Sequence, residues 1–191
     1  MKIGIDLDEV LADFTSAIIK FHNKTFNTSF QKDHLCIYEF WKIWGGTEKG
    51  MAREIDEFYK SHYFENIKPI PGSKIGVNVL SKKHDLKIIT ARQNYIADKT
   101  KKWLNNHFAN KFSEIHFANH YSPIGKSIKK SEICLKLDID LVIEDSLEYA
   151  KDCISVGKNV LLFDCPWNQS EKLPKNIKRV YSWKEIVESI G

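Results

Sequence analysis

The sequence predicts an α/β fold: a Rossmann-like parallel sheet with a small helical cap inserted after the first strand. Five apolar runs, each β-branched or aromatic-rich, have the length of strands. Helical patterns separate the later runs, and this alternation is typical of a parallel sheet covered by helices on both faces. A long interval without a convincing strand follows the first run. The five runs are residues 2–6, 86–90, 114–118, 140–144 and 159–163.

The helical patterns between the later runs have recognisable start and stop residues. Pro71-Gly72-Ser73 opens the first of them. Gly157 follows the last one and is typical of the end of a helix. We expect helices over 73–84, 95–107, 132–137 and 147–156, with Asn94, Ser131 and Ser146 as N-caps of the last three.

The interval after the first strand is too long for an ordinary crossover, which needs far fewer residues. It is helical in pattern and rich in aromatic residues, with a turn at Gly45-Gly46 and a return to the sheet at Pro69 and Pro71. We interpret residues 15–68 as a cap domain, and residues 1–14 and 69–191 as the core. An elaborate crossover packed onto the core is the alternative.

Composition and charge are those of an ordinary globular protein. The chain has 191 residues, 42% of them hydrophobic, and a formal net charge of +4. This length fits one domain, or one domain with a modest insertion. The lysines are scattered, which is typical of a solvated surface, although an anionic substrate or a weak nucleic-acid contact would also suit the basic excess. The oligomeric state stays open, a homodimer included.

The four cysteines show no CxxC spacing and follow no signal peptide, so we expect a reduced, cytoplasmic protein. His34 and Cys36 lie close in sequence, but no second pair completes a zinc site. No apolar run approaches the length of a membrane span. We therefore expect no membrane partner and no stable nucleic-acid partner.

Two acids close the first strand, although the strand itself is apolar. Asp6 and Asp8 are two residues apart, so period-two geometry points both side chains toward one site. A buried charge costs several kcal/mol unless a partner compensates it. Ligands of open parallel sheets bind beyond the carboxyl ends of the strands, and these acids lie at that edge.

Other strands deliver complementary groups to the same edge. Carboxylates, a hydroxyl and a lysine would meet there, which suits Mg²⁺ and a phosphate better than zinc. An aspartate in such a site can also act as a nucleophile toward phosphorus. The groups in question are Thr90-Ala91-Arg92, a loop with Lys126, Lys129 and Lys130, and the pair Glu144-Asp145.

Taken in order, these residues resemble the four motifs of the haloacid dehalogenase superfamily, most of whose members are phosphatases. Asp6-Leu7-Asp8 matches the first motif, Thr90 the second, a loop lysine the third and Glu144-Asp145 the fourth. The stretches 6–14 and 63–72 are similar to the cytosolic and mitochondrial 5′(3′)-deoxyribonucleotidases. The insertion lies where the family carries its helical cap.

The resemblance implies a role for each motif. Asp6 attacks phosphorus, and Asp8 protonates the leaving oxygen and then acts as base toward water. Mg²⁺ is held by the Asp6 carboxylate, the Asp8 backbone carbonyl and Asp145. The phosphoryl group is bound by Thr90, with Ala91, Arg92 and one lysine, for which we favour Lys130 over Lys126.

The resemblance also implies a nucleotide substrate, with Phe14 against the base and Trp41 as a further stacking candidate. Glu9 stands where the nucleotidases usually have glycine, and Glu144 replaces the more usual aspartate; whether Glu144 touches the metal stays open. The leading hypothesis is a Mg²⁺-dependent 5′-nucleotidase. The alternatives are a phosphatase for another small metabolite or a nucleic-acid end, and a catalytically silent nucleotide-binding protein.

Overall fold

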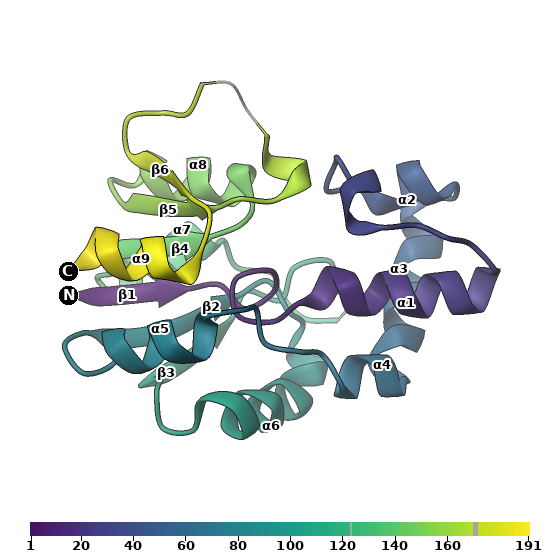
Figure 1. Cartoon of the computed structure of the whole chain (residues 1–191), viewed down its shortest axis with the longest axis horizontal. Coiled ribbons are helices and arrows are strands. Elements are labelled where there is room, and N and C mark those ends of the chain that lie inside the picture. Colours follow the sequence, from purple (N-terminus) through teal and green to yellow (C-terminus); the bar gives the residue numbers. More distant parts are fainter. Residues whose placement is uncertain (123, 170–171) are drawn as a thin grey trace.

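A computed structural model describes residues 1–122, 124–169 and 172–191. In this part of the chain six parallel strands form one sheet with the order β3-β2-β1-β4-β5-β6 (Figure 1). The predicted fold class is therefore confirmed. The strands are β1 (Lys2–Ile5), β2 (Asp85–Thr90), β3 (Glu114–Phe117), β4 (Leu141–Glu144), β5 (Asn159–Phe163) and β6 (Ile177–Val180).

The first strand lies in the middle of the sheet, between β2 and β4. Ile3 pairs with Leu86 on one side and with Leu141 on the other. Gly4 packs so closely that a Cβ atom there would lie 2.8 Å from Ile89 Cδ1. The Asp6 backbone N–H donates to the Ile143 carbonyl at 2.9 Å, which fixes Asp6 at the carboxyl edge.

Helices cover both faces of the sheet, as expected for a parallel sheet. Side chains of successive strand residues belong to two separate apolar clusters: Ile88 faces α5, α6 and α9, whereas Ile89 faces α7 and α8. This alternation explains why the strands read as continuous apolar runs. The helices are α5 (Ser73–Leu80), α6 (Ala97–Phe108), α7 (Lys130–Lys136), α8 (Leu147–Ser155) and α9 (Trp183–Ile190).

Of the three predicted N-caps, one is confirmed and two are wrong. Ser146 caps α8 by accepting from the Tyr149 N–H at 3.4 Å. Ser131 lies inside α7, and its hydroxyl donates to Asp152 at 2.6 Å, so a tertiary hydrogen bond has replaced the cap. Asn94 begins a 3₁₀ turn, η2 (Asn94–Ile96), which precedes α6 and displaces the helix start to Ala97.

The insertion between β1 and β2 is helical and lies to one side of the sheet (Figure 1). Both of its ends lie side by side: Ala12 and Pro69 form an antiparallel bridge, and the Asp13 N–H donates to the Lys68 carbonyl at 2.9 Å. The division into domains at residues 15–68 stays a prediction. The inserted elements are α1 (Phe14–Phe26), η1 (Lys32–His34), α2 (Phe40–Trp44), α3 (Glu48–Lys60) and α4 (His62–Glu65).

Most of the aromatic residues of this helical cap form its own interior. Phe58 is fully buried and meets Phe14 and Phe64 edge to face, with ring centroids 5.2 and 5.6 Å apart. Such edge-to-face pairs stabilise a core beyond the area that they bury. Among the described helices, none is both long and apolar enough to cross a membrane.

Candidate active site

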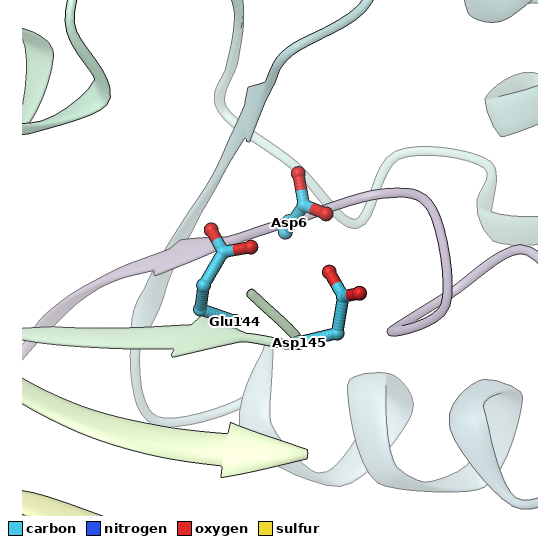
Figure 2. Close-up of side chains that lie close together, drawn as sticks. All are labelled: Asp6, Glu144 and Asp145. Carbon is cyan, nitrogen blue, oxygen red and sulfur yellow. The ribbon is translucent and has the colours of Figure 1, made fainter. Parts of the chain in front are cut away.

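Three buried carboxylates meet at the carboxyl edge of the sheet (Figure 2). Asp6 follows β1, Glu144 ends β4 and Asp145 is the next residue. One oxygen from each lies within 4.8 Å of the others, and the three residues are at most 5% exposed. The pairing of β1 with β4 thus places two predicted motifs, 138 residues apart in sequence, in one cluster.

Lys130 contacts this cluster from the first turn of α7. Its Nζ donates to Asp6 Oδ1 at 2.7 Å and to Glu144 Oε2 at 2.8 Å, and it lies 4.6 Å from the centre of the Tyr149 ring. Burial lowers the pKa of Lys130, but the Asp6 and Glu144 carboxylates outweigh it and hold the pKa well above its ordinary value. The charged ammonium form of Lys130 is therefore favoured.

The other candidate lysine is not in the cluster. Lys126 is exposed on the loop after β3, where its backbone carbonyl accepts from the Asn119 side chain at 3.3 Å. The structure therefore brings Lys130, and not Lys126, to the first and fourth motifs.

The acids carry more negative charge than Lys130 compensates. Burial raises the pKa of Asp6 to about 7, although Lys130 opposes the shift. Burial, followed by the charges of Glu144 and Asp6, raises the pKa of Asp145 well above its ordinary value. Both shifts mean that the ionised form of these acids is disfavoured, because among the described residues one ammonium group faces three carboxylates.

A divalent cation with hard-oxygen preference fits this donor set. Asp6 and Asp145 are the better ligands, because both Glu144 oxygens are already engaged, by Lys130 and by the Ser146 N–H at 3.2 Å. Asp145 is oriented by Trp167, whose indole N–H donates to Oδ2 at 2.9 Å. Glu144 therefore orients Lys130, and the donor chemistry suits Mg²⁺.

Asp8 lies beside this cluster but points to another partner. Arg92 grips both of its oxygens, with Nε 2.9 Å from Oδ2 and one terminal nitrogen 2.7 Å from Oδ1. Thr90 is buried at the end of β2, and its hydroxyl oxygen accepts from the Arg92 backbone N–H at 3.2 Å. The sequence predicted Arg92 as a phosphate ligand, whereas the structure places its guanidinium on Asp8.

A cavity of about 260 Å³ lies between Asp8 and Arg92 on one side and the cap on the other. Its size suits a small molecule rather than a polymer. The predicted base contacts Phe14 and Trp41 both line it, together with Ala91 from the second motif. Further lining comes from Asp8, Glu9, Asp145 and Trp167 of the core, and from Tyr38, Phe40, Met51 and Ile55 of the cap.

The whole chain matches a known family. The family described as "5' nucleotidase, deoxy (Pyrimidine), cytosolic type C protein" matches residues 1–190. The chain belongs to this family. It is thus a nucleotidase, as the stretches similar to the 5′(3′)-deoxyribonucleotidases predicted.

Individual relatives of this nucleotidase agree with the assignment. A 5′(3′)-deoxyribonucleotidase of Bacillus subtilis is 29% identical, over 96% of this chain and 95% of that protein. A nucleotidase of Clostridium acetobutylicum is 26% identical, over 97% and 91%. A haloacid dehalogenase-like hydrolase of Streptococcus pneumoniae has the same fold, with a TM-score of 0.73 at 15% identity, covering 100% of this chain and 98% of the other.

Glu9 links the first motif of the nucleotidase to the cap. Its backbone is left-handed (φ 64°), a conformation that favours glycine, the residue that the resemblance led us to expect there. Hydrogen bonds hold this conformation: the Glu9 N–H donates to the Ala12 carbonyl at 2.7 Å, and the carboxylate accepts from the Thr15 N–H at 2.6 Å and from Lys32. Glu9 therefore connects the start of α1 and the cap turn η1 to the loop that follows β1.

Sequence reasoning missed two residues of the nucleotidase site. Lys32 pairs with Glu9 and lies 5.8 Å from the centre of the Trp167 ring. Trp167, from the turn η3 (Pro166–Asn168), orients Asp145 through its indole N–H. The buried acid at Glu9 was the available signal for Lys32, because a buried carboxylate needs a cationic partner.

Proposed function

We propose that this nucleotidase is Mg²⁺-dependent and removes the phosphate of (deoxy)nucleoside 5′-monophosphates through an aspartyl-phosphate on Asp6. The observation that carries the proposal is the buried Asp6, held by Lys130 at 2.7 Å at the sheet edge and clustered with Asp145, which lines the aromatic cavity. A carboxylate held in this way is a nucleophile whose attack needs little reorganisation.

The first half of the reaction transfers the phosphoryl group. An Asp6 oxygen bonds to phosphorus as the bond from phosphorus to the nucleoside oxygen breaks, and Asp8 gives its proton to that leaving oxygen. Lys130 and Thr90 stabilise the charge on the phosphoryl oxygens. Trp41 and Phe14 hold the base in the cavity, where stacking is worth roughly 1–3 kcal/mol.

The second half restores the enzyme. Water attacks phosphorus, Asp8 takes its proton, and the bond from phosphorus to Asp6 breaks to release inorganic phosphate. Asp6, the Asp8 backbone carbonyl and Asp145 would hold Mg²⁺, which when bound neutralises negative charge on the phosphate and the acids. The cap excludes bulk water from the cavity during both halves.

The test is phosphate release from a panel of nucleoside monophosphates, sugar phosphates and p-nitrophenyl phosphate, with and without Mg²⁺. We expect Mg²⁺-dependent turnover with the highest kcat/KM on a nucleotide. Trapping with acid during turnover should leave labelled phosphate on wild-type protein and none on Asp6→Asn. A higher kcat/KM on sugar phosphates would contradict the substrate, and equal turnover by Asp6→Asn would contradict the nucleophile.

A further inference from the structure

Arg92 could either bind the phosphoryl group or orient Asp8, and its contacts in the structure favour the second role. Its position after the second motif suggests a ligand of the phosphoryl group. We infer instead that Arg92 is a positioning residue, which holds the Asp8 carboxylate in the orientation for proton transfer. This inference rests on the proposed function, since it concerns the proton that Asp8 gives to the leaving oxygen.

The contact between Arg92 and Asp8 fixes orientation as well as position. Two nitrogens of the guanidinium face the two carboxylate oxygens, at 2.9 and 2.7 Å. A planar fork of this kind prevents the carboxylate from rotating, which a single hydrogen bond would allow. Each oxygen of Asp8 keeps a further lone pair, and Asp8 lines the cavity, so a proton can still be exchanged with a bound substrate.

Arg92 is itself held on several sides. A second terminal nitrogen donates to Thr100 Oγ1 of α6 at 3.1 Å, and the guanidinium lies 5.1 Å from the centre of the Phe64 ring of α4. Its backbone N–H donates to Thr90. Arg92 is 4% exposed and Thr100 is fully buried. The fork is therefore anchored by a core helix and a cap helix before any substrate enters.

A phosphate-binding role would require this arrangement to come apart. To turn toward the phosphoryl group, the guanidinium would leave Asp8 and Thr100, and Asp8 would lose the partner that orients it. The site already has a cation that needs no rearrangement, because Lys130 contacts Asp6 at 2.7 Å. Lys130 therefore contacts the nucleophile Asp6, and Arg92 orients the proton donor Asp8.

Leaving-group dependence distinguishes the two duties. Expulsion of a nucleoside alkoxide requires a proton, whereas p-nitrophenolate leaves without one. In the step that forms the aspartyl-phosphate, a residue that orients the proton donor matters for the first substrate and much less for the second. Hydrolysis of that intermediate, in which Asp8 acts as base, is common to both substrates. A phosphate ligand matters equally for both, because their phosphoryl groups are identical.

The experiment compares wild type with Arg92→Met and Arg92→Lys on the best nucleotide of the panel and on p-nitrophenyl phosphate. The readout is the single-turnover rate of leaving-group release, which precedes hydrolysis of the aspartyl-phosphate. We expect this rate to fall about 100-fold on the nucleotide in Arg92→Met, within the range of general acid catalysis, and less than 5-fold on the aryl phosphate. Arg92→Lys should recover little, because an ammonium group cannot grip both oxygens. Inhibition by inorganic phosphate should change less than 3-fold.

Three further variants keep the test decisive. Thr100→Val removes one anchor of the fork with little change of shape, and should reproduce the selective loss more weakly even if Arg92→Met fails to fold. In an Asp8→Asn background, Arg92→Met should have little further effect on the nucleotide. Arg53→Met removes the same charge from an exposed position on α3, and both substrates should react as in wild type.

Two results would overturn the inference. Equal losses on both substrates together with weaker inhibition by phosphate would make Arg92 a phosphate ligand. Unchanged kinetics on both substrates would leave it without a role in the reaction. Either result is distinct from failure of the proposed function, which would appear as absent nucleotide turnover in wild-type protein.

Discussion

The two sides of the cavity differ in chemistry: the core side, here called the floor, is charged, and the cap side, here called the roof, is aromatic. The floor consists of charged side chains at strand ends, held by partners at 2.7–2.9 Å: Asp8 and Asp145 line the cavity, and Asp6, held by Lys130, lies beside Asp145. The roof consists of half-buried aromatic residues on short cap helices, such as Trp41. Charges at fixed distances suit a reaction, whereas adaptable apolar surface suits recognition. The difference teaches that changes to the floor should affect kcat and changes to the roof should affect KM.

The largest effect is expected for the nucleophile. Asp6→Asn keeps the size of the side chain but removes the attacking charge, so turnover should fall by at least about 10³-fold. Phosphate release under saturating substrate measures the loss, and circular dichroism checks that the fold is retained. Activity within tenfold of wild type would show that the floor does not supply the nucleophile.

Lys130 should follow in size. Lys130→Met removes the cation that contacts Asp6, and loss of one such charge-stabilising donor typically costs about 10²–10³-fold in kcat. Lys126→Met is the matched control and should retain wild-type kcat, since Lys126 lies on an exposed loop. A reversed order of the two variants would overturn the structural choice between these lysines.

A smaller effect is expected in the roof. Trp41→Ala should raise KM for the preferred nucleotide about 10-fold, with kcat nearly unchanged, because one base-stacking contact is lost. The KM for p-nitrophenyl phosphate should change less. Phe26→Ala alters a cap aromatic that is 54% exposed and outside this cavity, and serves as the control. If Trp41→Ala lowered kcat as strongly as Lys130→Met, the contrast between floor and roof would fail.

The smallest effect concerns stability without metal. Asp6 has a pKa of 3.8 when unperturbed and about 7 in the fold, so the folded state binds a proton that the unfolded state has lost. Stability is therefore fully present below about pH 4 and declines as the pH rises through 7. In a chelator, the melting temperature should fall by roughly 5 °C between pH 5 and pH 8.

Two controls test the cause of this decline. Excess Mg²⁺ at pH 8 should restore the melting temperature, because a bound cation compensates the carboxylates. Asp6→Asn should decline less than wild type in the chelator. A melting temperature that rose over this pH range in wild-type protein would show that the floor is not electrostatically strained.

The parts of this fold that sequence predicted are those set by local pattern. Buried strands such as β4 are continuous apolar runs, and they were placed to within a residue or two. Edge strand β6 was missed because the charged residues Lys178 and Arg179 separate its two apolar residues, so no apolar run marks it. The caps at Asn94 and Ser131 were wrong because tertiary hydrogen bonds claimed those segments instead.

In the site, too, the features set by local pattern were predicted and those set by tertiary contacts were not. Strand ends alone determine where Asp6 and Asp145 lie, so their proximity follows from topology. The grip of Arg92 on Asp8 joins residues 84 apart through two loops, and the direction of those side chains depends on packing against α4 and α6. Sequence placed both residues near the site but could not tell which partner each would take.

The two chain segments that connect the core to the cap run side by side at Ala12 and Pro69. Because these two segments are hydrogen-bonded to each other, the cap is attached to the sheet at one place, like the loop of a hairpin. The contact between Asp6 and Lys130 involves no residue between Asp13 and Lys68, so exchange of the cap would leave that contact in place. It would remove the Lys32 partner of Glu9 and the Phe64 ring beside Arg92, so a new cap has to supply partners for both.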